Sequence, residues 1–139
     1  MNVETAVAAV RNALAGITGF PAVMMRMVTA DDAAKTGGLG FPICALIRTT
    51  RTRETRDARR IYDSTIDLEC YVFIDESEDT LAEELDRISD LVDDAIWDLD
   101  LTSGDGLNCW VESDEVLEMI NPKWAGILIT IKANYQQSR

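Results

Sequence analysis

The sequence predicts one α+β domain: a mainly antiparallel sheet with a long charged β-hairpin, and two helices packed on one face. Two segments, Tyr62–Ile74 and Trp124–Tyr135, alternate their side chains with a period of two, as half-buried strands do. A third segment, Thr80–Asp100, repeats apolar residues at helical spacing. The helices are set apart from runs of strands, an order typical of α+β proteins. The 139 residues fit a single domain, 1–139.

The N-terminal part of the chain predicts a helix followed by a strand. Apolar residues recur at helical spacing over Asn2–Ala15, where alanine is abundant, and Gly16 is expected to end the helix. Ala22–Val28 is expected to be a strand. Thr29–Gly40 is expected to be a surface loop, because its glycines lack the spacing and the lysine of a phosphate-binding loop.

The predicted hairpin joins an apolar strand, Phe41–Ile47, to the strand Tyr62–Ile74 through a charged tip, Arg48–Arg60. The tip contains six of the thirteen basic residues of the chain. With its two acidic residues it carries a net charge of +4, whereas the whole chain carries −12. The six arginines of this Arg segment are Arg48, Arg51, Arg53, Arg56, Arg59 and Arg60. We interpret the segment as a basic finger on an acidic body, which could bind nucleic-acid phosphate, an acidic protein surface, or only water.

The helix Thr80–Asp100 is expected to begin with a capping box, Thr80–Glu83, and to pack one apolar face on the sheet. That face consists of Leu81, Leu85, Ile88, Val92, Ala95, Ile96 and Leu99. Its opposite face carries four aspartates spaced four residues apart, here called the Asp ridge: Asp86, Asp90, Asp94 and Asp98. Trp97 lies in the middle of this acidic face, and a large aromatic on a polar helix face often marks an interface. Three hypotheses stay open for the ridge: a solvated face, a dock for a basic surface such as the Arg segment of an identical neighbour, or a divalent-metal site.

The C-terminal part predicts two more strands. A turn precedes the strand Leu107–Ser113, a short acidic link passes through Asp114 and Glu115, and Trp124–Tyr135 follows. The last residues, Gln136–Arg139, are expected to be a polar tail.

Composition argues against several classes of function. The chain lacks histidine, which removes the commonest general base and a common metal ligand, so we expect no catalytic residue, metal or cofactor. The acidic balance argues against general nucleic-acid coating. No apolar run is long enough to span a bilayer and no secretory signal is evident, so we expect no membrane partner. Cys44, Cys70 and Cys109 are expected to be buried thiols in a reducing compartment.

The order of elements resembles the tail terminator proteins of long-tailed bacteriophages, also called tail completion or minor tail U-like proteins. The likeness covers almost the whole chain: an N-terminal amphipathic helix, the proline-bearing strand Phe41–Pro42–Ile43, the charged hairpin, and the helix "LAEELDRISDLVDDAIWDLDL". A final strand, "AGILITIKANYQ", closes the pattern. It is a pattern of elements and lengths, without a catalytic signature.

The resemblance implies a structural virion protein of the tail or neck, assembled in the host cytoplasm and without enzymatic activity. It implies a homo-oligomeric ring, usually a hexamer, that caps the tail tube, stops its polymerisation and presents a joining surface to the head or connector. DNA would pass through the lumen without specific binding. The Arg segment and the Asp ridge with Trp97 form a plausible pair for the two unlike patches that each ring interface needs.

Three other functions compete with the tail terminator. A head–tail connector or head-completion subunit would differ only in its partner. A nucleic-acid-binding module would act through the Arg segment, against the −16 carried by the rest of the chain. A small enzyme would have to use an Asp/Glu cluster, without histidine or a phosphate loop.

Overall fold

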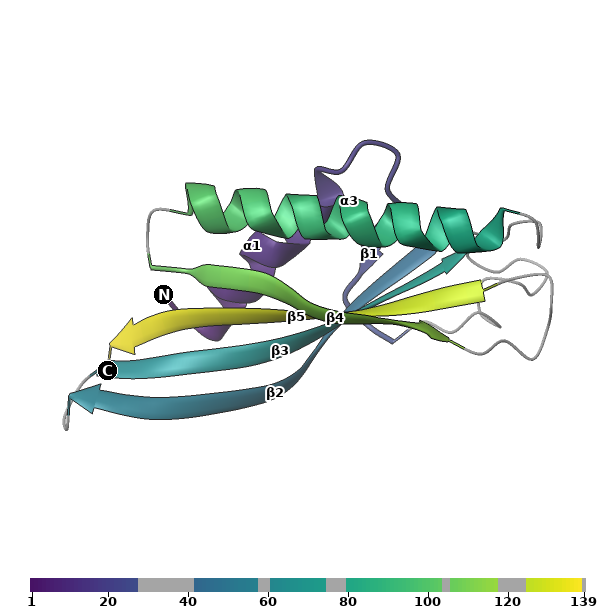
Figure 1. Cartoon of the computed structure of the whole chain (residues 1–139). Coiled ribbons are helices and arrows are strands. Elements are labelled where there is room, and N and C mark those ends of the chain that lie inside the picture. The colour runs from purple at the N-terminus through teal and green to yellow at the C-terminus, as the bar shows by residue number, and fades with distance from the viewer. Residues whose placement is uncertain (28–41, 58–60, 75–79, 104–105, 118–124, 139) are drawn as a thin grey trace.

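The computed structural model describes residues 1–27, 42–57, 61–74, 80–103, 106–117 and 125–138 (Figure 1). The described helices and strands follow one another as α1 (Val3–Ala15), β1 (Val23–Met24), β2 (Ile43–Asp57), β3 (Ile61–Ile74), α3 (Leu81–Thr102), β4 (Asn108–Leu117) and β5 (Ala125–Ser138). The predicted loop Thr29–Gly40 lies outside the described residues.

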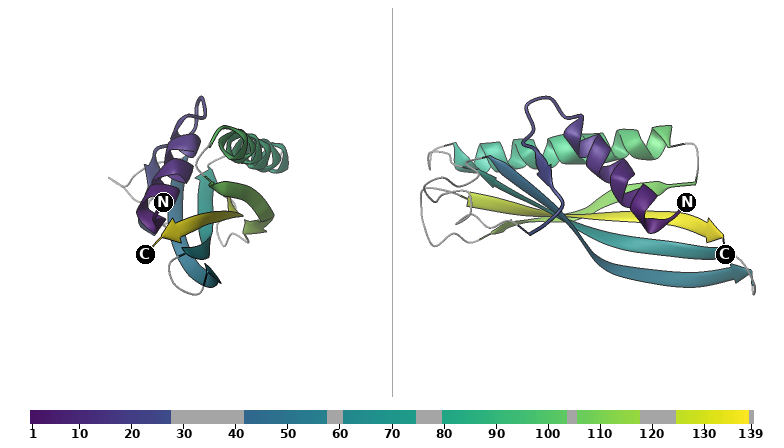
Figure 2. Two further views of the ribbon diagram at one scale, coloured as in Figure 1. Left: turned by 90° about the vertical axis from the view of Figure 1, so that its left-hand side faces the viewer. Right: turned by 180° about the vertical axis from the view of Figure 1, so that it is seen from behind.

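The five strands form one sheet in the order β1-β2-β3-β5-β4. Only the β1–β2 pair is parallel, and the other three pairs are antiparallel, as the sequence predicts for a mainly antiparallel sheet. Both helices cover the same face, with α3 over β4 and α1 nearer β2 (Figure 2). The α+β fold with two helices on one face is therefore confirmed.

The core lies between the sheet and the two helices. Alternate residues of β3 and β5 point into it, because successive side chains of a strand face opposite sides of the sheet. The helices contribute one stripe each, which includes Val10 of α1 and Val92 of α3. All three cysteines are free and buried, as expected, and the Sγ atoms of Cys44 and Cys70 are 3.7 Å apart on adjacent strands.

Two neighbouring residues of this core have buried hydroxyl groups. Ser64 of β3 and Tyr135 of β5 are cross-strand neighbours, and both side chains are 0% exposed. Within the described part of the chain, neither hydroxyl oxygen has a hydrogen-bond partner. Such groups lose their hydration without compensation, so they lower the stability of the fold.

The two helices begin differently. Asn2 caps α1, because its side-chain oxygen accepts a hydrogen bond from the Thr5 backbone N–H at 2.9 Å. Thr80 is the N-cap residue of α3, but its side chain makes no capping hydrogen bond. The predicted capping box is therefore wrong in this detail, although the helix begins where the box places it.

The Arg segment is the largest correction to the predicted elements. Its first ten residues are not a loop, because β2 runs on to Asp57 and pairs with β3 almost throughout. Arginine and threonine alternate here without apolar residues, so the hydrophobic pattern that reveals a strand is missing. Residues 58–60, which connect β2 to β3, lie outside the described residues.

Two further strands are longer than predicted and one is shorter. β4 includes Asp114 and Glu115, which the sequence places in a link, and β5 includes the first residues of the expected polar tail. These polar residues join the sheet because neighbouring strands supply backbone partners, which periodicity cannot show. Within the described residues, the expected strand Ala22–Val28 is reduced to β1, which pairs there with Cys44 and Ala45, and Val28 lies outside them.

Candidate assembly surfaces

A bulge in β2 sets three arginines on one face of the hairpin. Arg48 pairs with Leu68 and Arg51 with Ile66, although the two arginines are three positions apart in the chain and their partners only two. In a regular strand, two residues three positions apart point to opposite faces of the sheet. The bulge absorbs one residue and removes this difference between Arg48 and Arg51. The bulge therefore aligns them with Arg53 on the helix-covered face of the sheet, and we call Arg48, Arg51 and Arg53 the Arg stripe.

The Arg stripe is exposed along its length. All three side chains are solvent-exposed, and in the described part of the chain none of them makes an ion pair. Arg56 also belongs to β2, but its side chain is not described, and Arg59 and Arg60 lie outside the described residues. The described part of the predicted basic finger is therefore a row of arginines on one face of strand β2.

The Asp ridge runs along the exposed side of α3. Asp86, Asp90, Asp94 and Asp98 are all exposed. Trp97 lies among them with 65% of its surface exposed, and Leu101, one turn further, is 68% exposed. A large exposed aromatic side chain surrounded by carboxylates, as at Trp97, is typical of an interface centre with a charged rim.

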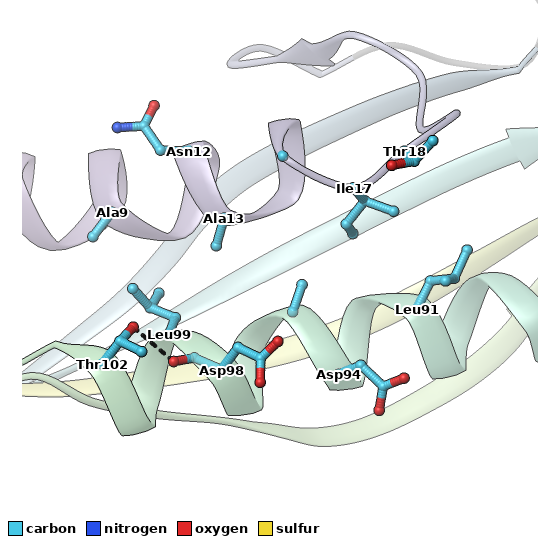
Figure 3. A pocket seen from close by; sticks show the side chains of 12 residues that line it. Ala9, Asn12, Ala13, Ile17, Thr18, Leu91, Asp94, Asp98, Leu99 and Thr102 are labelled. Atoms are coloured by element: carbon cyan, nitrogen blue, oxygen red, sulfur yellow. Dashed lines mark hydrogen bonds between the residues drawn. The ribbon is translucent and has the colours of Figure 1, made fainter.

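A groove between α1 and α3 borders part of the Asp ridge. The groove, with a volume of about 720 Å³, has small residues such as Ala9 and Ala13 on the α1 side (Figure 3). Asp94 and Asp98 line it on the α3 side. These two aspartates therefore lie on the groove side of α3.

The other side of α3 faces β4. The Ser89 hydroxyl donates a hydrogen bond to the Asp114 carboxylate, and the Cys109 backbone N–H donates one to Asp100 at 2.8 Å. Asp86 and Asp93 flank Ser89 on the helix surface, at three residues before it and four after it. Asp93 and Trp97 therefore lie on the β4 side of α3. The adjacent Asp94 lines the groove instead.

The sheet ends in edges of opposite charge. β4 is the last strand on the α3 side, and its described charged residues, Glu112, Asp114 and Glu115, are all acidic. β2, with the Arg stripe, lies toward the other end, where β1 covers only two of its residues. Within one chain the Arg stripe and the Asp ridge therefore lie on opposite sides, and no ion pair joins the two sets among the described residues.

A polar row crosses the open face of the sheet at the level of the bulges. The Thr50 hydroxyl donates a hydrogen bond to Asp67 at 2.7 Å, and Lys132 pairs with Asp67 at 3.1 Å and with Glu112 at 3.5 Å. The Thr50 hydrogen bond, followed by the Lys132 ammonium, lowers the pKa of Asp67, and the Asp67 carboxylate raises the pKa of Lys132. The row connects all four long strands. No sequence pattern signals it, because its residues are far apart in the chain.

Other kinds of site find no support in the described residues. No group of three or more His, Cys, Asp and Glu residues there could hold a metal ion, so the described part of the Asp ridge offers no metal site. None of the helices described here is both long and apolar enough to cross a membrane.

Comparison with known proteins gives one kind of match. No family model matches the sequence, and no curated protein matches it. The fold is similar to a chain in a solved structure described as "Virion of native gene transfer agent (GTA) particle", with a TM-score of 0.62 and 16% sequence identity. The likeness covers 94% of this chain and 93% of that chain. At this identity the match shows a shared fold over the whole domain.

Proposed function

We propose that this chain is a structural virion protein, and specifically a tail terminator that forms a ring on the end of a tail tube. The observation that carries this proposal is the likeness, over nearly the full length of both chains, to a component of a virion particle. The order and lengths of the elements, which resemble tail terminators, point the same way. The proposed ring is hexameric, stops tube growth, and offers its free face to the head or connector.

The charge distribution supports assembly into a ring. A ring needs a heterologous interface, in which one patch of a subunit meets a different patch of the next. The Arg stripe and the Asp ridge are unlike in charge and lie on opposite sides of the same chain. We propose that they meet between neighbouring subunits, with Trp97 as the apolar centre of the contact.

The acidic body fits passage of DNA rather than its capture. Outside the Arg segment the chain carries a net charge of −16, which repels phosphate. We therefore propose that DNA passes this protein without specific binding, and we assign it no enzymatic reaction and no cofactor.

The test measures mass in solution. Light scattering or analytical ultracentrifugation is run on the purified protein alone and, in parallel, with tail tubes purified from particles of the same virus. A ring, or monomers that assemble on tube ends, is the expected result. A monomer that ignores tube ends would contradict the proposal.

A head–tail connector or head-completion subunit is the second candidate. The similar chain is described only as part of a virion particle, so the shared fold is compatible with a neck position as well. Incubation of the protein with emptied heads and with tail tubes separates the two roles. Binding to heads in preference to tubes would favour the connector.

A further inference from the structure

The two edges of the sheet are complementary in more than charge. A sheet edge presents unpaired backbone N–H and C=O groups, which can template pairing with another strand. β4 is the outermost strand on one side, with ten residues. On the other side, β1 pairs with β2 at Cys44 and Ala45. Among the described residues, no strand other than β3 pairs with the segment of β2 that carries the Arg stripe, so this segment is an edge within the described part of the chain.

We propose that β2 of one subunit pairs edge to edge with β4 of the next, so that one sheet continues from subunit to subunit around the ring. This inference rests on the proposed function, because it needs an assembly of identical chains. It names the contact by which that assembly forms.

Strand direction agrees with this pairing. β2, β3, β5 and β4 alternate in direction because each neighbouring pair is antiparallel, so β2 and β4 run oppositely within one subunit. Rotation about an axis along the strands preserves direction, so β4 and the β2 of the next subunit would be antiparallel. Such pairing is heterologous, so it can repeat from copy to copy until a ring closes.

Charge selects this arrangement over pairing of like edges. β2 against a second β2 would bring arginines face to face, and β4 against a second β4 would do the same with carboxylates. Like charges opposite each other in a sheet are destabilising, whereas opposite charges stabilise the pair. Edge charges that only prevented aggregation would not need opposite signs at the two edges.

The pairing also decides which aspartates the Arg stripe meets. Paired strands share their faces, so the Arg stripe would lie on the helix-covered face beside β4, next to the β4 side of α3. Residues that pair across neighbouring strands form a row of the sheet, and the row of Arg48 ends at Val111, whereas the row of Arg51 ends at Cys109. A rotation without translation along the axis keeps each row at its height. Arg48 of one subunit would therefore lie beside Val111 of the next, and Arg51 beside Cys109. Cys109 contacts α3 at Ile96 and Asp100. The Arg stripe is thereby expected to meet the β4 side of the acidic face of α3, at Asp93 and Trp97, whereas Asp94, on the groove side of the ridge, lies farther from it.

The first arm of the test uses engineered cysteines on the two edges. Thr52 of β2 and Asn108 of β4 are exposed and lie in one row of the sheet. The double variant T52C/N108C is treated with a flexible bismaleimide under conditions in which the wild-type protein assembles. We expect a ladder of bands that extends beyond the dimer, whereas T52C alone or N108C alone gives dimers at most. The native thiols should not react, because all three are buried.

The second arm compares two adjacent aspartates. D93K and D94K make the same change in charge at two exposed positions of one helix. We expect D93K to weaken assembly at least about tenfold, since like charge would face the Arg stripe, and D94K to change it less than about threefold. Thermal unfolding of both variants checks that each is folded.

The outcomes separate this inference from the proposed function. Assembly without a ladder beyond the dimer, or D94K as harmful as D93K, would overturn the edge pairing and leave the terminator in place. Failure of the wild-type protein to assemble, alone or on tubes, would overturn both.

Discussion

The two edges of the sheet both present unpaired backbone groups, and they carry side chains of opposite charge. β2 carries arginines and threonines, and β4 carries carboxylates together with the exposed Trp110 and Val116. Each edge also has a bulge, between Arg48 and Arg51 in β2 and between Val111 and Ser113 in β4. Charges and bulges are common protections of edge strands. Opposite signs, however, protect each edge only from its own kind, which leaves the unlike edge of a second copy as the favoured partner.

Reversal of the charge on the basic edge should weaken association more than any other change. In R51E/R53E both edges become acidic, so we expect association to weaken at least about 100-fold through like-charge repulsion. Sedimentation velocity over a range of concentrations measures the change. T49A, which removes an uncharged side chain from the same strand, serves as the control. An unchanged distribution of species would remove the Arg stripe from the interface.

Replacement of Trp97 tests the apolar part of the acidic side. Trp97 is 65% exposed, so W97E should leave the fold intact while placing another carboxylate in the contact. We expect association to weaken roughly 30-fold, as for a central interface aromatic. The matched control is L101E, because Leu101 is equally exposed on the same helix but lies one turn nearer its end. Equal losses in both variants would show that the contact is centred elsewhere.

Salt should weaken association less than either substitution. Screening shortens the reach of exposed charges to about 3 Å at 1 M ionic strength, from about 10 Å at 0.1 M. An interface of arginines and carboxylates should therefore dissociate progressively as sodium chloride is raised. Light scattering at constant protein concentration follows the change. Association that is indifferent to salt would indicate an apolar contact around Trp97 instead.

The polar row should give the smallest effect, and it acts within one subunit. The pKa of Asp67 is lowered below its ordinary value of 3.8, so its contribution to stability is present above about pH 4 and is lost as the pH falls through the folded-state value. In D67N this acid-sensitive part should disappear, a difference below about 1 kcal/mol because the group is partly exposed. Thermal unfolding between pH 2 and about pH 6 measures both proteins. Parallel curves for the two would show that the row does not stabilise the fold.

Tyr71 reports on the pH dependence of stability at alkaline pH. The hydrogen bond from the Tyr71 hydroxyl to Glu69, aided by burial, raises the pKa of Tyr71 to about 12. Its contribution is complete below about pH 10 and is lost as the pH rises through the folded-state value. Absorbance titration of the wild type and of Y71F should differ by one tyrosine that ionises near pH 12. A difference that appears near pH 10 would contradict this hydrogen bond.

The fold could be predicted where hydrophobic periodicity is strong. β3, the core of β5 and the buried stripe of α3 can be read directly, because each alternates or repeats with its own period. The outer half of β2 and the acidic end of β4 cannot, since a polar strand at an edge is held by its neighbour's backbone rather than by a buried face.

The candidate surfaces were predictable in composition but not in arrangement. Both the Arg segment and the Asp ridge follow from charge spacing alone. The bulge that aligns Arg48 with Arg51 depends on pairing with β3, which one strand's sequence does not encode. Likewise, no helical pattern shows that Asp94 borders the groove between α1 and α3 while Asp93 does not, because this depends on where the second helix packs.

The buried hydroxyls of Ser64 and Tyr135 offer a practical route to a thermostable background. Neither has a hydrogen-bond partner in the described structure, and both side chains are fully buried. S64A and Y135F would remove an uncompensated desolvation cost, on the order of 1 kcal/mol each, without any change at either edge. Interface variants made in this stabilised background would lose contacts between subunits, whereas each subunit would stay folded. Loss of assembly would then be separable from loss of the fold.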